Sequence, residues 1–230
     1  MEDITLEEDH QALLQLFMKV KAATCQEIFD WGAKLELING WGDLEDKIVT
    51  INRVIRVFRQ QIQKCTDEET EQDHYVFFNM SDNEIARLAI LFTKPQLEFF
   101  KKLIEKIVLS SSGYVYKDDV VETCRTELEE LNVKIGLTEA FELIQKWIDF
   151  KYFSDNSSGK RICLGVSSLT ELSPYLKQYY PHNVTSCELC KFICLQGVDC
   201  HHLSVKLHNR CAIKYFDSFK NCSTCRDNVK

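Results

Sequence analysis

Hydrophobic side chains recur at helical spacing along the first third of the chain and predict three helices followed by a strand. The predicted helices cover residues 9–22, 25–37 and 44–62. Asp9 can cap the first helix, and Asn39-Gly40 is a helix-stop signal after the second. A polar, acid-rich connector then leads to the aromatic and β-branched run His74–Asn79, which is typical of a strand or short hairpin.

The same order of elements returns in the next part of the chain, although the sequence itself does not repeat. Pro95 suits the first residue of a helix that the run Ser110–Gly113 ends, and Thr138 is a candidate cap for a later helix. The remaining predicted elements are helices at about 117–131 and 138–148 and strands at about 149–153 and 160–164. Three helices followed by two strands around a tight turn are typical of a winged-helix domain.

These patterns predict an α+β fold with two winged-helix-like domains, a linker helix and a small C-terminal module. The predicted boundaries are 1–92, 93–168, 169–184 and 185–230. The linker helix is expected from Leu169 to Tyr180, and Pro174 inside it marks either a kink or the true start of the helix.

Charge and hydropathy narrow the class of protein. The net charge is −7, and residues 181–230 hold 7 Lys and Arg against 4 Asp and Glu. The rest of the chain is therefore strongly acidic, which argues against a general polyanion binder. The first residues are acidic rather than basic and apolar, so a signal peptide is not expected, and no long uncharged apolar run predicts a membrane span.

The chain has 11 cysteines, and seven of them fall between positions 187 and 225. We interpret the four scattered cysteines as small buried side chains; they are Cys25, Cys65, Cys124 and Cys163. Clustered cysteines with interleaved histidines, in a chain without a secretion signal, indicate a metal site rather than disulfides.

The clustered residues form four pairs at spacings that zinc ligands use. The pairs are Cys187 with Cys190, Cys200 with His202, His208 with Cys211, and Cys222 with Cys225. A gap of two residues lets both side chains of a pair reach one ion, and a mixed thiolate and imidazole set suits Zn²⁺. Eight ligands imply two zinc ions.

The pairs can be combined sequentially or in a crossed arrangement, and the short gap between the second and third pairs favours crossing. Site one is then Cys187, Cys190, His208 and Cys211, and site two is Cys200, His202, Cys222 and Cys225. So few apolar residues surround the pairs that the metal must supply much of the folding free energy. Two alternatives stay open: His201 competes with His202 for the fourth position, and Cys194 is a ninth thiol outside the pairs.

Several of these segments resemble the non-SMC element one family, the RING-like subunit of the SMC five–six chromosome-maintenance complex. The resembling segments are Tyr179–Pro181, Cys187–Cys190, Leu195–Cys200, His208–Cys211 and Ala212–Phe216. The resemblance is sharpest from Tyr175 to Cys225, and the double winged-helix arrangement extends it over nearly the whole chain.

The sequence departs from the expected pattern at Leu203 and at Ser223. The family's ligand order is four cysteines, one histidine and three cysteines, yet the fourth position expected after Cys200 is Leu203, so the role moves to His202. RING modules often have proline after the seventh ligand, where Ser223 stands here.

A PHD finger shares the family's ligand order. It carries an aromatic residue two positions before the seventh ligand, where this chain has Lys220.

The resemblance implies a nuclear DNA-repair subunit that pairs with a MAGE-type winged-helix protein and a kleisin subunit. It also implies a RING-type ubiquitin ligase whose activity is weak outside its complex. Such a module does no covalent chemistry and instead positions a ubiquitin-charged conjugating enzyme. The candidate contacts are the apolar Leu189 on the first metal loop and Arg226 after the last ligand.

Two other functions compete with a ligase. One is a purely architectural subunit, in which the zinc module and the winged helices only bind their neighbours. The other is direct DNA binding, which the sequence disfavours because Glu139 and Glu142 outnumber Lys146 on the predicted recognition helix. The wing offers only a small basic patch, so weak or absent DNA binding is expected. No hydrolytic or phosphate-binding motif stands out.

Overall fold

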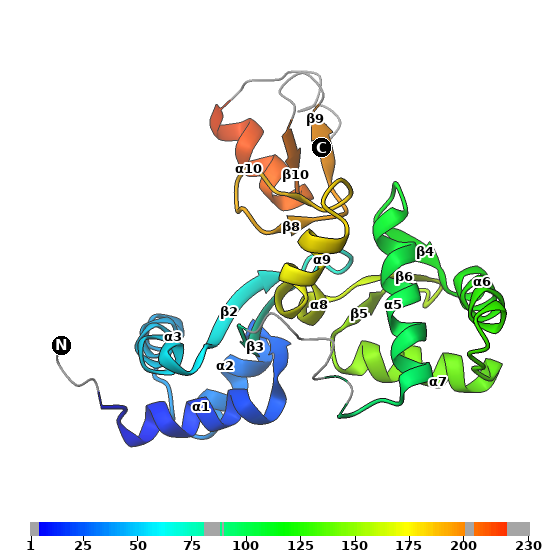
Figure 1. Cartoon of the computed structure of the whole chain (residues 1–230). Coiled ribbons are helices and arrows are strands. Elements are labelled where there is room, and N and C mark those ends of the chain that lie inside the picture. The colour runs from blue at the N-terminus through cyan, green and yellow to red at the C-terminus, as the bar shows by residue number, and fades with distance from the viewer. Residues whose placement is uncertain (1–4, 81–87, 89, 201–204, 220–230) are drawn as a thin grey trace. The chain divides into compact units, whose positions relative to one another are not determined.

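The computed structural model describes residues 5–80, 88, 90–200 and 205–219 (Figure 1). The fold mixes helices and short antiparallel sheets, which confirms the α+β expectation at that level. The chain forms two compact units: residues 1–67 with 72–82 make the first, and residues 68–71 with 83–230 make the second. Among the described residues, no helix has the length and apolar character needed to cross a membrane.

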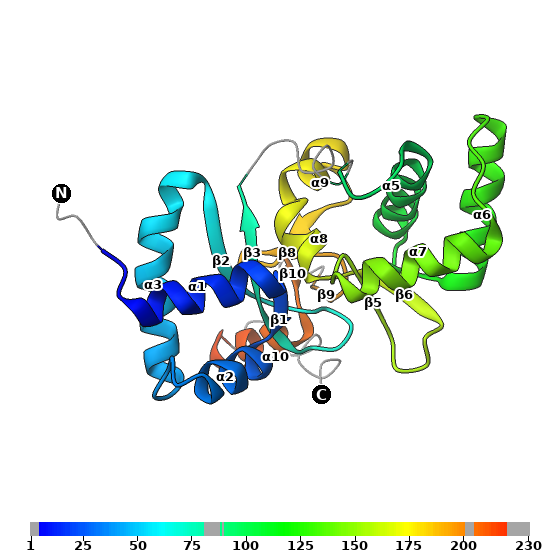
Figure 2. The same ribbon diagram turned by 90° about the horizontal axis from the view of Figure 1, so that it is seen from below.

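Three helices and a three-stranded antiparallel sheet make up the first unit. The helices are α1 (Glu8–Val20), α2 (Cys25–Lys34) and α3 (Trp41–Ile55). The strands are β1 (Ala22–Thr24), β2 (Gln60–Thr66) and β3 (Asp73–Asn79), in the order β1-β3-β2. Helix α1 crosses α3 (Figure 2), and their apolar faces pack together, so that Phe17 of α1 and Ile51 of α3 lie in one buried core. Thr24 caps α2 through a reciprocal pair of hydrogen bonds with Glu27.

The predicted helix 44–62 is too long at its C-terminal end. Helix α3 ends at Ile55, and the 3-10 turn η1 (Arg56–Phe58) leads to Arg59, whose φ of 55° is left-handed and breaks the helix. Ile62 lies instead in β2 opposite Phe77. The Asn52 side chain fixes this arrangement, because it donates to Ile62 O at 2.8 Å and accepts from Ile62 N at 2.7 Å. Apolar spacing alone could not distinguish a continuing helix from a strand beginning here.

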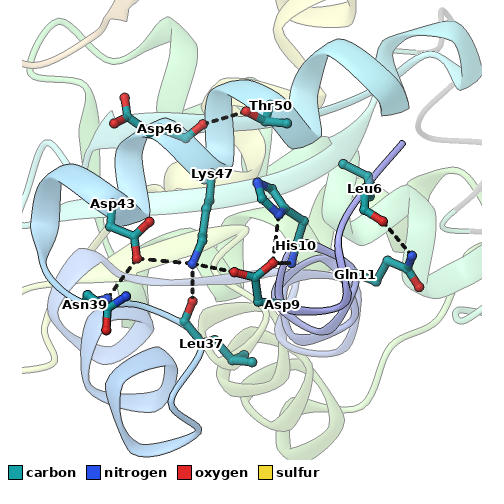
Figure 3. A network of polar contacts seen from close by, with 10 residues as sticks. All are labelled: Leu6, Asp9, His10, Gln11, Leu37, Asn39, Asp43, Asp46, Lys47 and Thr50. Carbon is teal, nitrogen blue, oxygen red and sulfur yellow. Dashed lines mark hydrogen bonds and ion pairs between the residues drawn. The ribbon is translucent and has the colours of Figure 1, made fainter. Parts of the chain in front are cut away.

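A buried lysine joins three parts of the first unit (Figure 3). Lys47 on α3 is only 10% exposed, and its Nζ donates to Leu37 O at 2.7 Å and to Asp43 Oδ2 at 3.1 Å. It also pairs with Asp9 Oδ2 on α1 at 2.7 Å. Asn39 N donates to the same Asp43 oxygen at 2.8 Å, so the loop before α3 is held as well.

The second unit contains a similar set of elements. Its first helices are α5 (Lys94–Leu109), α6 (Lys117–Glu130) and α7 (Leu137–Asp149). The sheet has the order β4-β6-β5, with β4 (Tyr114–Tyr116), β5 (Phe153–Asp155) and β6 (Arg161–Leu164). Fully buried Trp147 lies at the centre of the core, within 5.0–5.9 Å of the rings of Phe99, Phe100 and Phe153.

Two details of this unit differ from the sequence prediction. Gly136, not Thr138, is the residue that precedes the first turn of α7. The single helix expected from Leu169 to Tyr180 is two helices, α8 (Val166–Glu171) and α9 (Ser173–Tyr179), and Pro174 lies in the first turn of α9. Proline is accepted in a first turn because its missing N–H would have no helical partner there.

The C-terminal part of the second unit is built from short strands and one helix. Strand β7 (Thr185–Ser186) pairs with β8 (Ile193–Cys194), and β9 (Val198–Cys200) pairs with β10 (Val205–Leu207). Helix α10 (Asn209–Phe219) follows. Val184, Ile193 and Leu195 belong to the same buried core as Trp147, so this module packs onto the helices of its own unit. Within the module, Gly197 permits the close approach of the chain to β10, since a Cβ there would lie 2.3 Å from Leu207 O.

Candidate metal centre

A tight turn and the start of a helix bring the first and third predicted ligand pairs together. Cys187 N donates to Phe192 O at 2.8 Å, and Lys191 N donates to Cys187 O at 2.9 Å, which folds the chain back between Cys187 and Cys190. The third pair, His208 with Cys211, lies at the beginning of α10, where Ala212 N donates to His208 O at 2.7 Å. One helical turn therefore separates His208 from Cys211, and both side chains lie on one side of α10.

Cys187, Cys190, His208 and Cys211 form one cluster. Their ligand atoms all lie within 4.8 Å of one another, and Cys190 Sγ is 3.3 Å from His208 Nδ1. Three thiols and an imidazole at this separation fit a tetrahedral Zn²⁺ ion, which such ligands bind at about 2.0–2.3 Å. The cluster is the predicted site one, with the ligand pairs combined as the crossed arrangement requires.

The electrostatics of the cluster also suit a cation. Burial raises the pKa of Cys190, but hydrogen bonds with His208, the Phe192 backbone and Cys187 together outweigh it and lower that pKa to about 7. Burial raises the pKa of Cys211 to about 11. Burial alone would lower the pKa of His208, yet hydrogen bonds with Cys190, Cys194 and Glu68 raise it. Thiols packed around one imidazole need a positive charge to become thiolates, and a divalent metal bound there would supply it.

Site two stays a prediction. Cys200 is buried at the end of β9. Its proposed partners and the conjugating-enzyme contact after them lie outside the described residues; they are His202, Cys222, Cys225 and Arg226. The alternative ligand His201 lies outside them too. Leu189, between the first two ligands, is 38% exposed and is accessible to a partner.

Cys194 lies beside site one without belonging to it. Its buried thiol donates to Gln196 O at 3.1 Å. The ligand atoms of Cys194, Glu68 and His208 lie within 4.8 Å of one another. Sequence reasoning missed Glu68, which stands about 140 residues before His208 in an acid-rich connector. No spacing rule could have linked the two residues.

The family model described as the Nse1 non-SMC component of the SMC5-6 complex matches residues 9–172. The chain belongs to the Nse1 family. The match covers most of the first unit and the part of the second that runs through α8, and it ends before the metal cluster.

Among curated relatives, the non-structural maintenance of chromosomes element 1 homolog of Bos taurus is 25% identical over 221 residues, covering 95% of this chain and 79% of the relative. The Drosophila melanogaster homolog is 30% identical over 138 residues, 58% of this chain and 55% of the relative. A solved chain of an Nse1-Nse3-Nse4 complex is similar with a TM-score of 0.76 and 24% identity, covering 93% of this chain and 92% of that one. At that identity the structural match supports the Nse1 fold alone.

Proposed function

We propose that this Nse1-family chain is a subunit of the nuclear SMC5-6 complex and acts there as a RING-type ubiquitin-ligase component. Its C-terminal module binds two zinc ions, and its two units each contain a winged-helix domain. The observation that carries the proposal is the cluster of Cys187, Cys190, His208 and Cys211 within 4.8 Å, in the crossed pairing of a RING.

The partners are supported by the similar solved chain, which belongs to a complex of Nse1, Nse3 and Nse4. We infer that this chain binds the corresponding MAGE-type and kleisin subunits. Three helices with a three-stranded sheet, α1–α3 in the first unit and α5–α7 in the second, suit a winged-helix scaffold for such contacts.

The module acts by positioning rather than by chemistry of its own. A bound zinc ion fixes the two loops of site one, and exposed Leu189 between Cys187 and Cys190 offers an apolar contact to a conjugating enzyme. Holding the ubiquitin thioester in a reactive geometry removes orientational freedom before the amine attacks, which lowers the barrier. Arg226 is the proposed donor to that complex.

Discharge of ubiquitin from a loaded conjugating enzyme tests the proposal. The assay contains the full chain with its MAGE-type and kleisin partners, and it compares wild type with Leu189→Ala. We expect the wild type to accelerate discharge and Leu189→Ala to lower the rate at least about tenfold, the effect of losing one central apolar contact.

Leu131→Ala is the matched control. Leu131 is also exposed, but it lies at the end of α6 and away from the metal ligands in sequence, so its removal should leave discharge unchanged. Equal rates for wild type and Leu189→Ala would contradict the proposed contact. If the assembled wild type does not accelerate discharge, the ligase role is contradicted.

An architectural subunit without ligase activity is the alternative function. Val57 and Phe58, in the 3-10 turn of the first unit, are 76% and 69% exposed, and adjacent exposed apolar side chains favour a binding surface. This alternative predicts assembly with the partners and no discharge of ubiquitin.

Direct DNA binding has less support. Helix α7 carries half-buried Glu139 and exposed Glu142, and the Lys146 ammonium lies over the Phe92 ring, 5.0 Å from its centroid. In the wing, Arg161 pairs with Glu69 at 2.6 Å. These contacts occupy basic groups that a phosphate backbone would need, so we expect weak or no binding in a DNA titration at low salt.

A further inference from the structure

The segment Glu68–Glu71 belongs to the second unit, although it lies between strands β2 and β3 in sequence. Glu69 pairs with Arg161 of β6 at 2.6 Å. At the other end of the segment, Glu71 O accepts from Arg210 Nη1 at 3.0 Å, next to the ligand Cys211. The segment is therefore attached on both sides of Glu68, whose side chain points to the metal centre.

Glu68 is a carboxylate with almost no exposure to solvent. Its side chain is 2% exposed, and backbone N–H groups surround it. Leu195 N donates to Oε1 at 2.9 Å, and Gln196 N donates to Oε2 at 3.3 Å. A buried carboxylate is costly unless such donors compensate it. The same Oε1 lies 3.2 Å from His208 Nε2.

The ring of His208 is held from both sides. Its Nδ1 faces the thiols, 3.3 Å from Cys190 Sγ, so Nδ1 is the atom available to a metal. A neutral imidazole that uses Nδ1 as a ligand carries its proton on Nε2. That N–H has two acceptors, Ile193 O at 2.9 Å and Glu68 Oε1 at 3.2 Å.

We propose that Glu68 is a positioning residue of metal site one, which fixes the tautomer and orientation of His208 from a segment far away in sequence. The inference rests on the proposed zinc site. Carboxylates that accept from the distal N–H of a metal-bound histidine raise its basicity as a ligand and restrict its rotation. Three thiolates and Zn²⁺ leave a net charge of −1, so the N–H groups of Leu195 and Gln196 are what allow a further anion beside them.

The arrangement makes the segment Glu68–Glu71 a part of the metal module. The first and third ligand pairs bind the ion, and a third chain segment, Glu68–Glu71, holds one of those ligands in place. Occupation of the metal site and docking of this segment therefore stabilise each other, because each depends on the same imidazole orientation.

Zinc release from the full-length protein tests the proposal, with an excess of chelator and a chromogenic zinc indicator as the probe. The variants are Glu68→Ala and the isosteric Glu68→Gln, which keeps one side-chain oxygen and guards against a folding defect. We expect one phase of zinc release to accelerate about 10–100-fold in Glu68→Ala, the usual effect of losing an outer acceptor, and less in Glu68→Gln.

Glu69→Gln is the matched control, since it weakens the pair with Arg161 in the same segment and leaves the Glu68 carboxylate in place. Its release rate should rise far less than that of Glu68→Ala. A long-range ¹H–¹⁵N spectrum adds a signature that a merely structural role would not move: in the wild type, His208 should show a slowly exchanging Nε2 proton, which should exchange faster in Glu68→Ala, where Ile193 O is the remaining acceptor.

Three results would overturn the inference. Equal release by wild type and Glu68→Ala would show that the carboxylate does not support His208. Equal acceleration by Glu69→Gln would assign the effect to docking of the segment. A wild-type protein that takes up no zinc would remove the proposed site itself, and the inference with it, whereas the first two results leave the zinc site intact.

Discussion

At the scale of single residues, the first unit depends on a charge that is almost completely buried. Lys47 is satisfied by Leu37 O and by the carboxylates of Asp9 and Asp43, and these groups come from three separate segments (Figure 3). Neither hydrophobic periodicity nor capping rules indicated this network, because a lysine on an amphipathic helix is expected to reach solvent. The sequence predicted Asp9 only as a helix cap, which is wrong because α1 begins at Glu8 and Glu7 precedes it.

Replacing Lys47 should lower the stability of the first unit, because its partners would lose their donor. In Lys47→Met, two carboxylates lose their counter-ion and Leu37 O loses its donor, so the free energy of unfolding should fall by about 1–2 kcal/mol at neutral pH. The range is below that of a fully buried pair because the carboxylates are partly exposed. Denaturant unfolding measures it. Lys64→Met, which breaks the exposed pair with Glu45, should change stability by less than about 0.5 kcal/mol.

The same network predicts an acid dependence. The hydrogen bond from Lys47 outweighs burial and lowers the pKa of Asp9 to about 2, against an ordinary value of 3.8. The stability that Asp9 contributes is therefore present above pH 3.8 and is lost as the pH falls toward 2. Lys47→Met should lose less stability over this window than the wild type. Parallel curves for the two proteins would contradict the role given to the pair.

At the scale of elements, the sequence predicted the helices more accurately than the points where they end. The apolar spacing from Leu44 continues through Ile62, yet the chain turns at Arg59, and only the structure shows Asn52 joined to Ile62. Strand β4 was missed because it has three residues and follows a Ser-rich stop. Pro174 was noted as a possible helix start, and α9 begins beside it. The ends of helices and the short strands depend on tertiary contacts, and these contacts cannot be read from the order of apolar and polar residues.

Helix α7 provides the test at this scale, since it contributes Trp147 to the core of the second unit. Trp147→Ala should lower the free energy of unfolding by about 3–5 kcal/mol, because the cavity lies among Phe99, Phe100 and Phe153 and cannot collapse fully. Calorimetry or denaturant titration measures the loss. Phe150→Ala, on the exposed end of the same helix, should cost no more than about 1 kcal/mol. Similar losses in both variants would contradict the central position of Trp147.

At the scale of the whole molecule, the sequence predicted which residues gather in the site-one cluster but not the carboxylate beside it. Paired spacing was sufficient to group Cys187, Cys190, His208 and Cys211, since each pair lies on one turn of chain. Glu68 could not be found in the same way, because its contact with His208 joins segments about 140 residues apart. Ligands follow local spacing, whereas the groups that orient them follow the tertiary fold.

The zinc content of the purified full-length chain tests the central claim most directly. Elemental analysis should find two zinc ions per wild-type chain. It should find one in Cys211→Ser, which removes a ligand of site one, and one in Cys200→Ser, which removes a ligand of site two. Cys163→Ser is the control, because its buried thiol donates to Ser154 O outside the cluster and a hydroxyl can replace it; it should retain both ions. A folded wild-type chain without zinc, or Cys211→Ser with undiminished zinc, would contradict the account.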